Sequence, residues 1–82
     1  MNDAISERFT ACAVEMLNVE ADKITPDATF AGDLGADSLD LVEFVMRLEE
    51  EFDVTIEEDE LKDVRTVGRA LDLVRSKLGS TL

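Results

Sequence analysis

A chain of 82 residues has room for one small domain, and its 45% hydrophobic content is too high for a disordered tail. Its 20 acidic and 8 basic residues give a net charge of −12, which disfavours binding to nucleic acid and to anionic membranes. Without histidine, and with Cys12 as its one cysteine, the sequence lacks a Ser-His-Asp triad, the usual zinc ligand sets and any internal disulfide. We therefore expect one domain over residues 1–82 that is not an enzyme and has no metal site.

The same features predict where the protein works. Copies with this charge repel one another, so we expect a monomer. No secretory signal pattern follows Met1, no apolar run is long enough to span a membrane, and a single cysteine fits a reducing compartment. We expect a cytoplasmic protein with no membrane insertion.

The first predicted helix covers about residues 3–17. Apolar residues recur there at helical spacing: Ile5, Phe9, Cys12, Ala13, Met16 and Leu17. Asn2 or Asp3 can cap its start, and Asn18 can end it. A long connection over residues 19–36 follows, with the only proline of the chain. Its apolar residues are expected to pack against the core: Ile24, Phe30 and Leu34.

The second predicted helix, about residues 38–52, is apolar over more of its circumference than one buried face requires. One stripe is expected in the core: Leu41, Val45, Leu48 and Phe52, with Phe44 beside it. A second stripe, at spacing i, i+3, i+7, consists of Leu39, Val42 and Met46. Acidic residues surround the second stripe, with Arg47 as the basic exception, so this stripe is either core or an exposed binding surface.

The rest of the chain predicts a loop and two more helices. The β-branched residues of Val54–Ile56 could suggest a strand, but the sequence offers no partner strand, so we expect a loop with Val54 or Ile56 turned inward. A short helix should run from about Glu57 to Lys62 or Asp63. The last helix should cover about residues 66–78, with an apolar face made of Val67, Ala70, Leu71, Val74 and Leu78. The predicted fold is all-α: a small antiparallel bundle of three main helices plus one short helix, with a long loop between the first and second helices.

Ser38 lies where the glycine-containing loop meets the second helix. A helix N-terminus has unpaired N–H groups and a partial positive charge, so it accommodates a phosphate well. The site is therefore either a plain helix start, with Asp37 or Ser38 as the cap, or the attachment point of a phosphate-linked group. These three residues, Asp37-Ser38-Leu39, favour a cap when taken alone. Without a histidine to act as base, a hydrolase nucleophile is disfavoured.

The wider context of Ser38 is more specific. Residues 30–40, Phe-Ala-Gly-Asp-Leu-Gly-Ala-Asp-Ser-Leu-Asp, are followed by Val42-Glu43, Met46 and Leu-Glu-Glu-Glu-Phe at 48–52. This pattern resembles the acyl carrier protein family, and the resemblance extends from the first helix to Leu78. In that family the serine carries 4′-phosphopantetheine through a phosphodiester, and the arm's thiol holds acyl groups as thioesters. The resemblance implies that residues 1–82 form a single acyl carrier domain with Ser38 as the attachment residue.

The resemblance also implies partners and a pocket. The second helix looks like the element that phosphopantetheinyl transferase and acyl-processing enzymes of fatty acid biosynthesis recognise through basic patches. The implied partner-binding residues are Asp37, Leu39, Asp40, Val42, Glu43, Met46, Glu49 and Glu50. In the family part of the core opens around the acyl chain, and the implied pocket residues are Phe44, Val45, Leu48, Ile56, Leu61, Val64, Ala70 and Leu71.

Two positions depart from the family pattern. Small residues are common at position 61, which is Leu61 here, and Arg47 replaces a usually small neutral residue beside the docking face. One alternative therefore remains a specialised carrier for polyketide or other secondary acyl assembly. The other is an acidic helical protein-interaction module without a prosthetic group. The acidic residues around Ser38 lack the spacing of a calcium-binding loop, and Cys12 is expected in the core.

Overall fold

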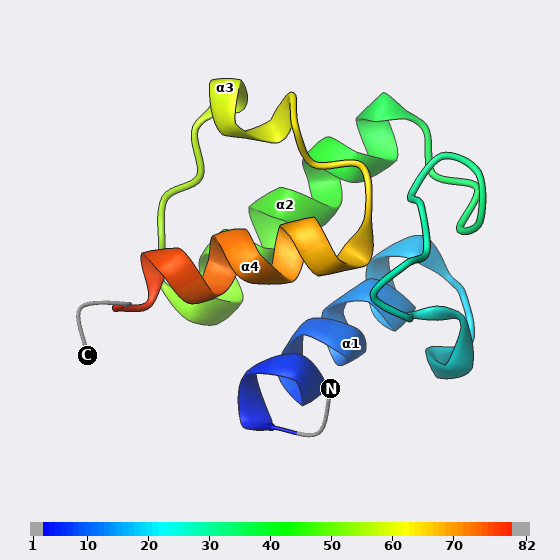
Figure 1. Cartoon of the computed structure of the whole chain (residues 1–82), viewed down its shortest axis with the longest axis horizontal. Helices are drawn as coiled ribbons and strands as arrows, with labels where there is room; N and C mark the ends of the chain where they lie inside the picture. The colour runs from blue at the N-terminus through cyan, green and yellow to red at the C-terminus, as the bar shows by residue number, and fades with distance from the viewer. Residues whose placement is uncertain (1–2, 80–82) are drawn as a thin grey trace.

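The computed structural model describes residues 3–79, which contain four α-helices and one 3-10 helix joined by loops (Figure 1). In chain order they are α1 (Ala4–Leu17), η1 (Ala21–Lys23), α2 (Ser38–Phe52), α3 (Glu58–Leu61) and α4 (Val67–Lys77). Helix α1 packs against α2 and α4, and α3 lies on the opposite side of α4 from α1 in Figure 1. The all-α prediction is confirmed, including the long loop between α1 and α2. Within residues 3–79 the only β-type pairing is an isolated antiparallel bridge between Thr29 and Thr66.

Local capping explains where the main helices begin and end. The Asp3 carboxylate caps α1 by accepting the backbone N–H of Ser6 at 2.8 Å, while Asn2, the alternative cap, lies outside the described residues. Asn18 ends α1 in the left-handed conformation, with φ of 56°. Thr66 caps α4 through its hydroxyl, which accepts the N–H of Arg69.

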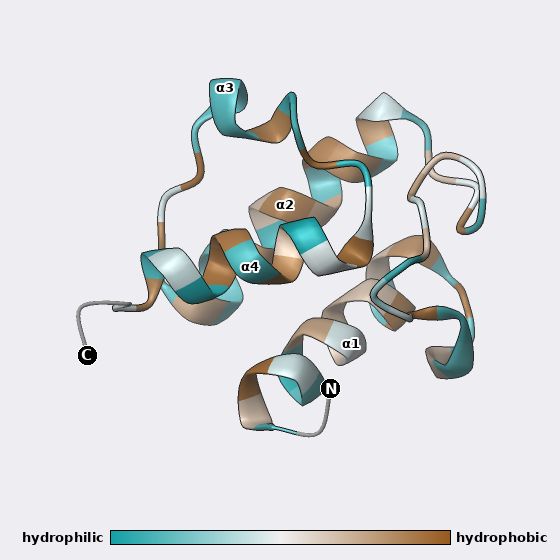
Figure 2. Ribbon diagram, viewed as in Figure 1, coloured by the Kyte–Doolittle hydropathy of each residue, from teal (hydrophilic) through white to brown (hydrophobic). Residues whose placement is uncertain are grey.

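The core is centred on Phe44 of α2, which is fully buried. The Phe9 ring of α1 meets it edge to face at 5.3 Å between centroids, and the Phe30 ring of the long loop lies 5.7 Å away. These three rings join three separate segments of the chain. Figure 2 shows hydrophobic and hydrophilic residues alternating along α1, α2 and α4, as expected of helices that each bury one face.

The long loop is held against the segment that enters α4. The N–H of Phe30 donates to the carbonyl of Arg65 at 3.0 Å, and the N–H of Val67 donates to the carbonyl of Ala28 at 2.9 Å. Ile24, Phe30 and Leu34 are buried, as predicted. The loop is therefore part of the packed domain, which fixes the position of the residues that precede α2.

Several apolar residues lie elsewhere than the periodicity predicted. Leu61 ends the single turn of α3 and is only partly buried at the edge of the core, because a four-residue helix leaves its last residue beside solvent. Leu78 is 39% exposed because it follows the last residue of α4. Met16, one residue before the end of α1, is exposed as well. In the segment after α2, Ile56 is the buried anchor and Val54 is only partly buried.

An ion-pair network joins α1 to α2. The Nε of Arg8 lies 2.7 Å from Oε2 of Glu51, and this hydrogen bond, with a smaller contribution from Arg47, lowers the pKa of Glu51. The guanidinium of Arg47 lies 3.2 Å from Oε1 of Glu51 and 3.3 Å from Oε1 of Glu15. Arg47 therefore turns toward α1. Beneath the network Cys12 is buried in the core, and burial raises the pKa of its thiol.

The start of α1 is linked to α4 by a cluster of three residues, in which Ser6 and Arg75 lie 69 positions apart in the sequence. Arg75 lies 2.7 Å from Oδ2 of Asp3 and donates to the hydroxyl of Ser6, which is fully buried. The hydrogen bond from the backbone N–H of Ser6 and the Arg75 guanidinium lower the pKa of Asp3 to about 2, from its ordinary 3.8. The folded state therefore favours the ionised carboxylate.

A pH-dependent stability difference should follow for Asp3→Asn. When a carboxylate has a lower pKa in the folded state than in the unfolded state, its ionised form stabilises the fold. This contribution to the free energy of unfolding is fully present above the unfolded-state pKa and is lost as the pH falls through the folded-state pKa. The wild type should therefore exceed the variant in free energy of unfolding at about pH 7, and the difference should shrink between about pH 4 and pH 2. Urea unfolding of both proteins across this range measures it. A difference that stayed constant down to about pH 2 would contradict this role of the Asp3 carboxylate.

Candidate functional site

Ser38 is the first residue of α2, and its neighbours perform the capping. The Asp37 carboxylate accepts the N–H of Asp40 at 2.9 Å, and the Asp40 carboxylate accepts the N–H of Asp37 at 3.2 Å, which completes a capping box. Ser38 is exposed, and its hydroxyl has no hydrogen-bond partner within residues 3–79. Asp37, and not Ser38, is therefore the helix cap, and the serine hydroxyl is available for modification.

The loop before α2 presents Ser38 without crowding it. Gly35 adopts φ of 65°, a left-handed conformation that glycine accepts without steric cost, and a Cβ there would meet nothing within 4 Å. Ala36 is buried, and its N–H donates to the carbonyl of Phe30 at 2.7 Å. Thr29 and Asp33 close the preceding turn through the Asp33 carboxylate, which accepts the Thr29 N–H at 2.8 Å. The serine thus sits at the end of an ordered turn with open space before it.

Two surface hollows meet at Ser38. The first, which we call the loop-side hollow, has a volume of about 430 Å³ and is lined by Phe30, Ala31, Ser38, Leu41, Val64 and Arg65, among others. The second, the α3-side hollow, has a volume of about 400 Å³ and is lined by Ser38, Leu41, Val42, Glu58, Leu61 and Lys62, among others. Both volumes fall in the range of about 300–1,000 Å³ that is usual for pockets that hold small ligands. A group attached to Ser38 would therefore start between two concave surfaces.

The predicted partner-binding residues have different roles in the structure. The apolar stripe is exposed, with Leu39 at 64% and Met46 at 55% exposed and Val42 between them on α2. The carboxylates of Glu43 and Glu50 are exposed and have no hydrogen bond or ion pair within the described residues. We define the docking face by these five residues: Leu39, Val42, Glu43, Met46 and Glu50.

The other three predicted partner residues also maintain the fold. Asp37 and Asp40 form the capping box, and Oε2 of Glu49 accepts the N–H of Ile56 at 2.8 Å, which holds the loop after α2. Sequence reasoning missed Met16, which it placed in the core face of α1. Met16 lines a hollow of about 410 Å³ together with Glu43, Met46, Arg47 and Glu50, so α1 places an exposed apolar residue next to these residues of α2.

The predicted pocket residues lie together in the core, with one exception. Seven are buried: Phe44, Val45, Leu48, Ile56, Val64, Ala70 and Leu71. Leu61 instead lines the α3-side hollow next to Ser38. Leu61 is therefore packed against the edge of the core and does not lie among the seven buried residues.

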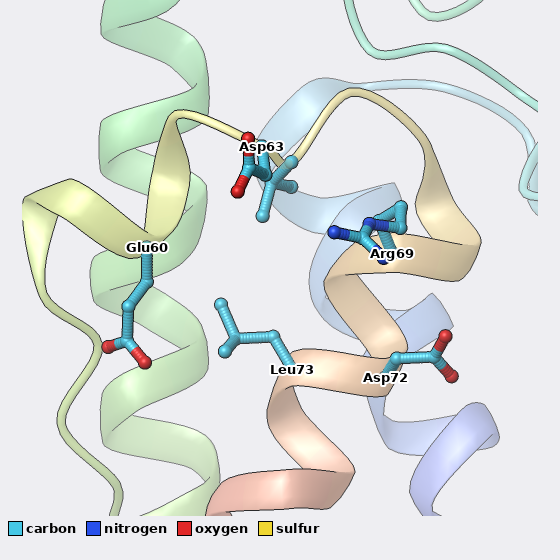
Figure 3. Close-up of a pocket in the computed structure, with 6 residues that line it drawn as sticks. Glu60, Asp63, Arg69, Asp72 and Leu73 are labelled. Carbon is cyan, nitrogen blue, oxygen red and sulfur yellow. The ribbon is translucent and has the colours of Figure 1, made fainter.

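A further hollow between α3 and α4 has a charged rim (Figure 3). It measures about 320 Å³, and Leu73 of α4 reaches into it between Glu60 and the Asp63–Arg69 side. The carboxylates of Glu60, Asp63 and Asp72 outnumber the single cation of Arg69, so this hollow does not suit an anionic group. Among residues 3–79 there is also no group of three or more side chains placed to hold a metal ion.

Comparison with known proteins identifies the family. The family model for a phosphopantetheine attachment site matches residues 7–74. The acyl carrier protein of a Picosynechococcus species is 42% identical over 80 residues, covering 98% of this chain and 99% of that protein. This chain belongs to the acyl carrier protein family. It is a non-catalytic carrier with a phosphopantetheine attachment site, as the sequence pattern around residues 30–52 implied. Within the described residues, none of the carrier's helices is long and apolar enough to cross a membrane.

Proposed function

We propose that Ser38 is the residue of this carrier to which 4′-phosphopantetheine is attached. The main support is the exposed hydroxyl of Ser38, which has no hydrogen-bond partner within residues 3–79 because Asp37 caps the helix instead. Ser38 also lies inside the range that matches the family model. A phosphodiester there would lie at the positive end of a helix of 15 residues, which favours an anion.

The chain's own residues would present the attached group. Once attached, the arm supplies a terminal thiol that holds acyl groups as thioesters. Gly35 and the capping box would fix the direction in which the arm leaves the domain. The buried apolar core would shelter an acyl chain, and its seven buried residues, with Leu61 packed at the edge of the core, are the proposed pocket.

The docking face is proposed to receive partner enzymes. Leu39, Val42 and Met46 form an exposed apolar centre, and Glu43 and Glu50 add unpaired negative charge at its edge. This combination suits a basic surface around an apolar contact, which steers association and gives salt-sensitive binding. The proposed partners are phosphopantetheinyl transferase and acyl-processing enzymes with basic patches.

Fatty acid biosynthesis is the proposed pathway. Arg47 and Leu61, the two departures from the family pattern, give little support to a specialised carrier because of where they lie in the structure. Arg47 pairs with Glu15 and Glu51, so it adds no unpaired positive charge to the docking face. Leu61 is only partly buried at the edge of the core, so its side chain does not lie in the core interior. We further propose that residues 1–82 act as one monomeric carrier domain in the cytoplasm, where a reducing environment keeps the arm's thiol reduced.

Ser38→Ala should abolish attachment of the arm. Incubation with a phosphopantetheinyl transferase and coenzyme A should add the mass of one phosphopantetheine to the wild type and none to the variant. Intact mass spectrometry measures the adduct, and Ser76→Ala, which changes an exposed serine on α4, is the matched control that should still be modified. A wild type without adduct, or a modified Ser38→Ala protein, would refute the assignment.

A further inference from the structure

Arg65 is one of three basic side chains without an ion pair within residues 3–79, and the other two are Lys23 and Arg69. Of the eight basic side chains, all within residues 3–79, five form ion pairs: Arg8, Arg47, Lys62, Arg75 and Lys77. Arg65 forms none within the described residues, although the chain has 20 acidic residues. It lines the loop-side hollow together with Ser38. A cation without an ion pair in the described part of the chain therefore lines the same hollow as the proposed attachment residue.

The backbone of Arg65 is held in place from both sides. Its carbonyl accepts the N–H of Phe30 at 3.0 Å, and the adjacent Thr66 forms the bridge to Thr29. These contacts attach Arg65 to the same loop that forms the opposite wall of the hollow. The arginine side chain therefore projects from a fixed point on the rim, so the entropy lost on binding an anion is limited to its own rotamers.

The loop-side hollow also has an apolar wall. Phe30 and Val64 are buried core residues whose surfaces close its base, and Leu41 of α2 is partly buried beside them. A phosphopantetheine arm begins with a phosphodiester and continues into a segment with two geminal methyl groups. A cation near the serine, followed by an apolar wall, matches that order of chemical groups.

We propose that the loop-side hollow seats the phosphopantetheine arm of this carrier, with Arg65 binding the phosphodiester and Phe30, Leu41 and Val64 packing against the methyl groups. The proposal rests on attachment at Ser38. Arginine presents a planar fork of donors that can bind two phosphate oxygens at once. Asp37 also lines this hollow, but its Oδ1 accepts the N–H of Asp40 within the capping box.

The α3-side hollow suits the phosphodiester less well. Glu58 and Asp59 line it and would repel an anion. Its one cation, Lys62, lies 3.4 Å from Oδ1 of Asp59 and is already paired. The two hollows therefore divide by chemistry: the loop-side hollow offers an unpaired cation and an apolar wall, and the α3-side hollow offers acidic residues that repel the phosphodiester.

Nuclear magnetic resonance on the holo-protein tests where the arm lies. The arm is attached with ¹³C-labelled geminal methyl groups, and intact mass first confirms one adduct on the wild type and none on Ser38→Ala. Nuclear Overhauser contacts from the methyl protons to Ala31 and Val64 are then expected, together with a shift of the Arg65 Nε–Hε resonance on attachment. Arg65→Gln should lower these contact intensities roughly two- to fivefold, the loss of one exposed ion pair.

Matched variants decide the role of Arg65. Arg69 also has no ion pair in the described residues, but it lies outside the loop-side hollow. Arg69→Gln therefore removes the same charge elsewhere and should leave the methyl contacts unchanged. Arg65→Lys should restore part of the intensity. Three results with a modified Ser38 would overturn this inference alone. The methyl groups of the arm could contact Leu61 instead, they could contact neither hollow, or their contact intensities could stay the same in Arg65→Gln. Absence of an adduct at Ser38 would overturn the attachment as well.

Discussion

Phe44→Ala is expected to lower the free energy of unfolding by about 3–5 kcal/mol. Phe44 is 0% exposed, and its ring contacts Phe9 of α1 and Phe30 of the long loop, so truncation leaves a cavity where three segments meet. Small domains have a total stability of about 5–15 kcal/mol, so the loss removes a large share of it. At roughly 4–8 °C per kcal/mol for a domain of this size, the melting temperature should fall by more than about 10 °C.

Thermal and urea unfolding followed by circular dichroism measure this loss. Met46→Ala, on the same helix but at an exposed position, is the matched control and should change the free energy of unfolding by no more than about 0.5 kcal/mol. Because Phe30 belongs to the loop that leads to Ser38, the Phe44 variant should also show increased amide exchange at residues 30–36. A loss below about 1 kcal/mol would show that the three rings are not the centre of the core.

Local signals predicted the fold well. The apolar spacing placed α2 at its observed bounds and α4 within a residue of them, because this signal acts over one or two turns of the chain. The 3-10 helix Ala21–Lys23 was not predicted, since it carries no apolar period of its own. Leu61 and Met16 were expected in the core but are partly buried and exposed, respectively. Periodicity predicts which face of a helix is apolar, but not how far the neighbouring elements extend over that face.

The site was predictable only in part for the same reason. The pattern of residues 30–40 indicated Ser38, and the second stripe of α2 indicated an exposed surface. Nothing in the sequence places Arg65, 27 positions later, in a hollow with Ser38, or joins Asp3 to Arg75 across the domain. Likewise, the structural role of Glu49 depends on the backbone N–H of Ile56 after the end of its own helix. These relations depend on tertiary packing, which no local signal encodes.

Reversing the two unpaired charges of the docking face should strongly reduce the rate at which partner enzymes associate with the carrier. For Glu43→Lys combined with Glu50→Lys, we expect kcat/KM of a phosphopantetheinyl transferase to fall by about 10- to 100-fold at low ionic strength. Both carboxylates are exposed and have no ion pair within residues 3–79, so they can act on an approaching basic surface without first breaking an internal contact. Electrostatic steering changes association rates by about 10- to 1,000-fold.

The control must separate local charge from net charge. Glu20→Lys combined with Asp72→Lys changes the net charge equally at exposed positions outside the docking face, and it should lower kcat/KM less than about threefold. Glutamate and lysine have similar helix propensities, so the docking-face variant should keep α2 intact. Because salt screens exposed charges, its deficit should shrink as the ionic strength rises toward about 1 M, where the Debye length falls to about 3 Å. Equal losses in the two double variants would mean that the overall field of the carrier, and not the charge beside Leu39, Val42 and Met46, guides its partners.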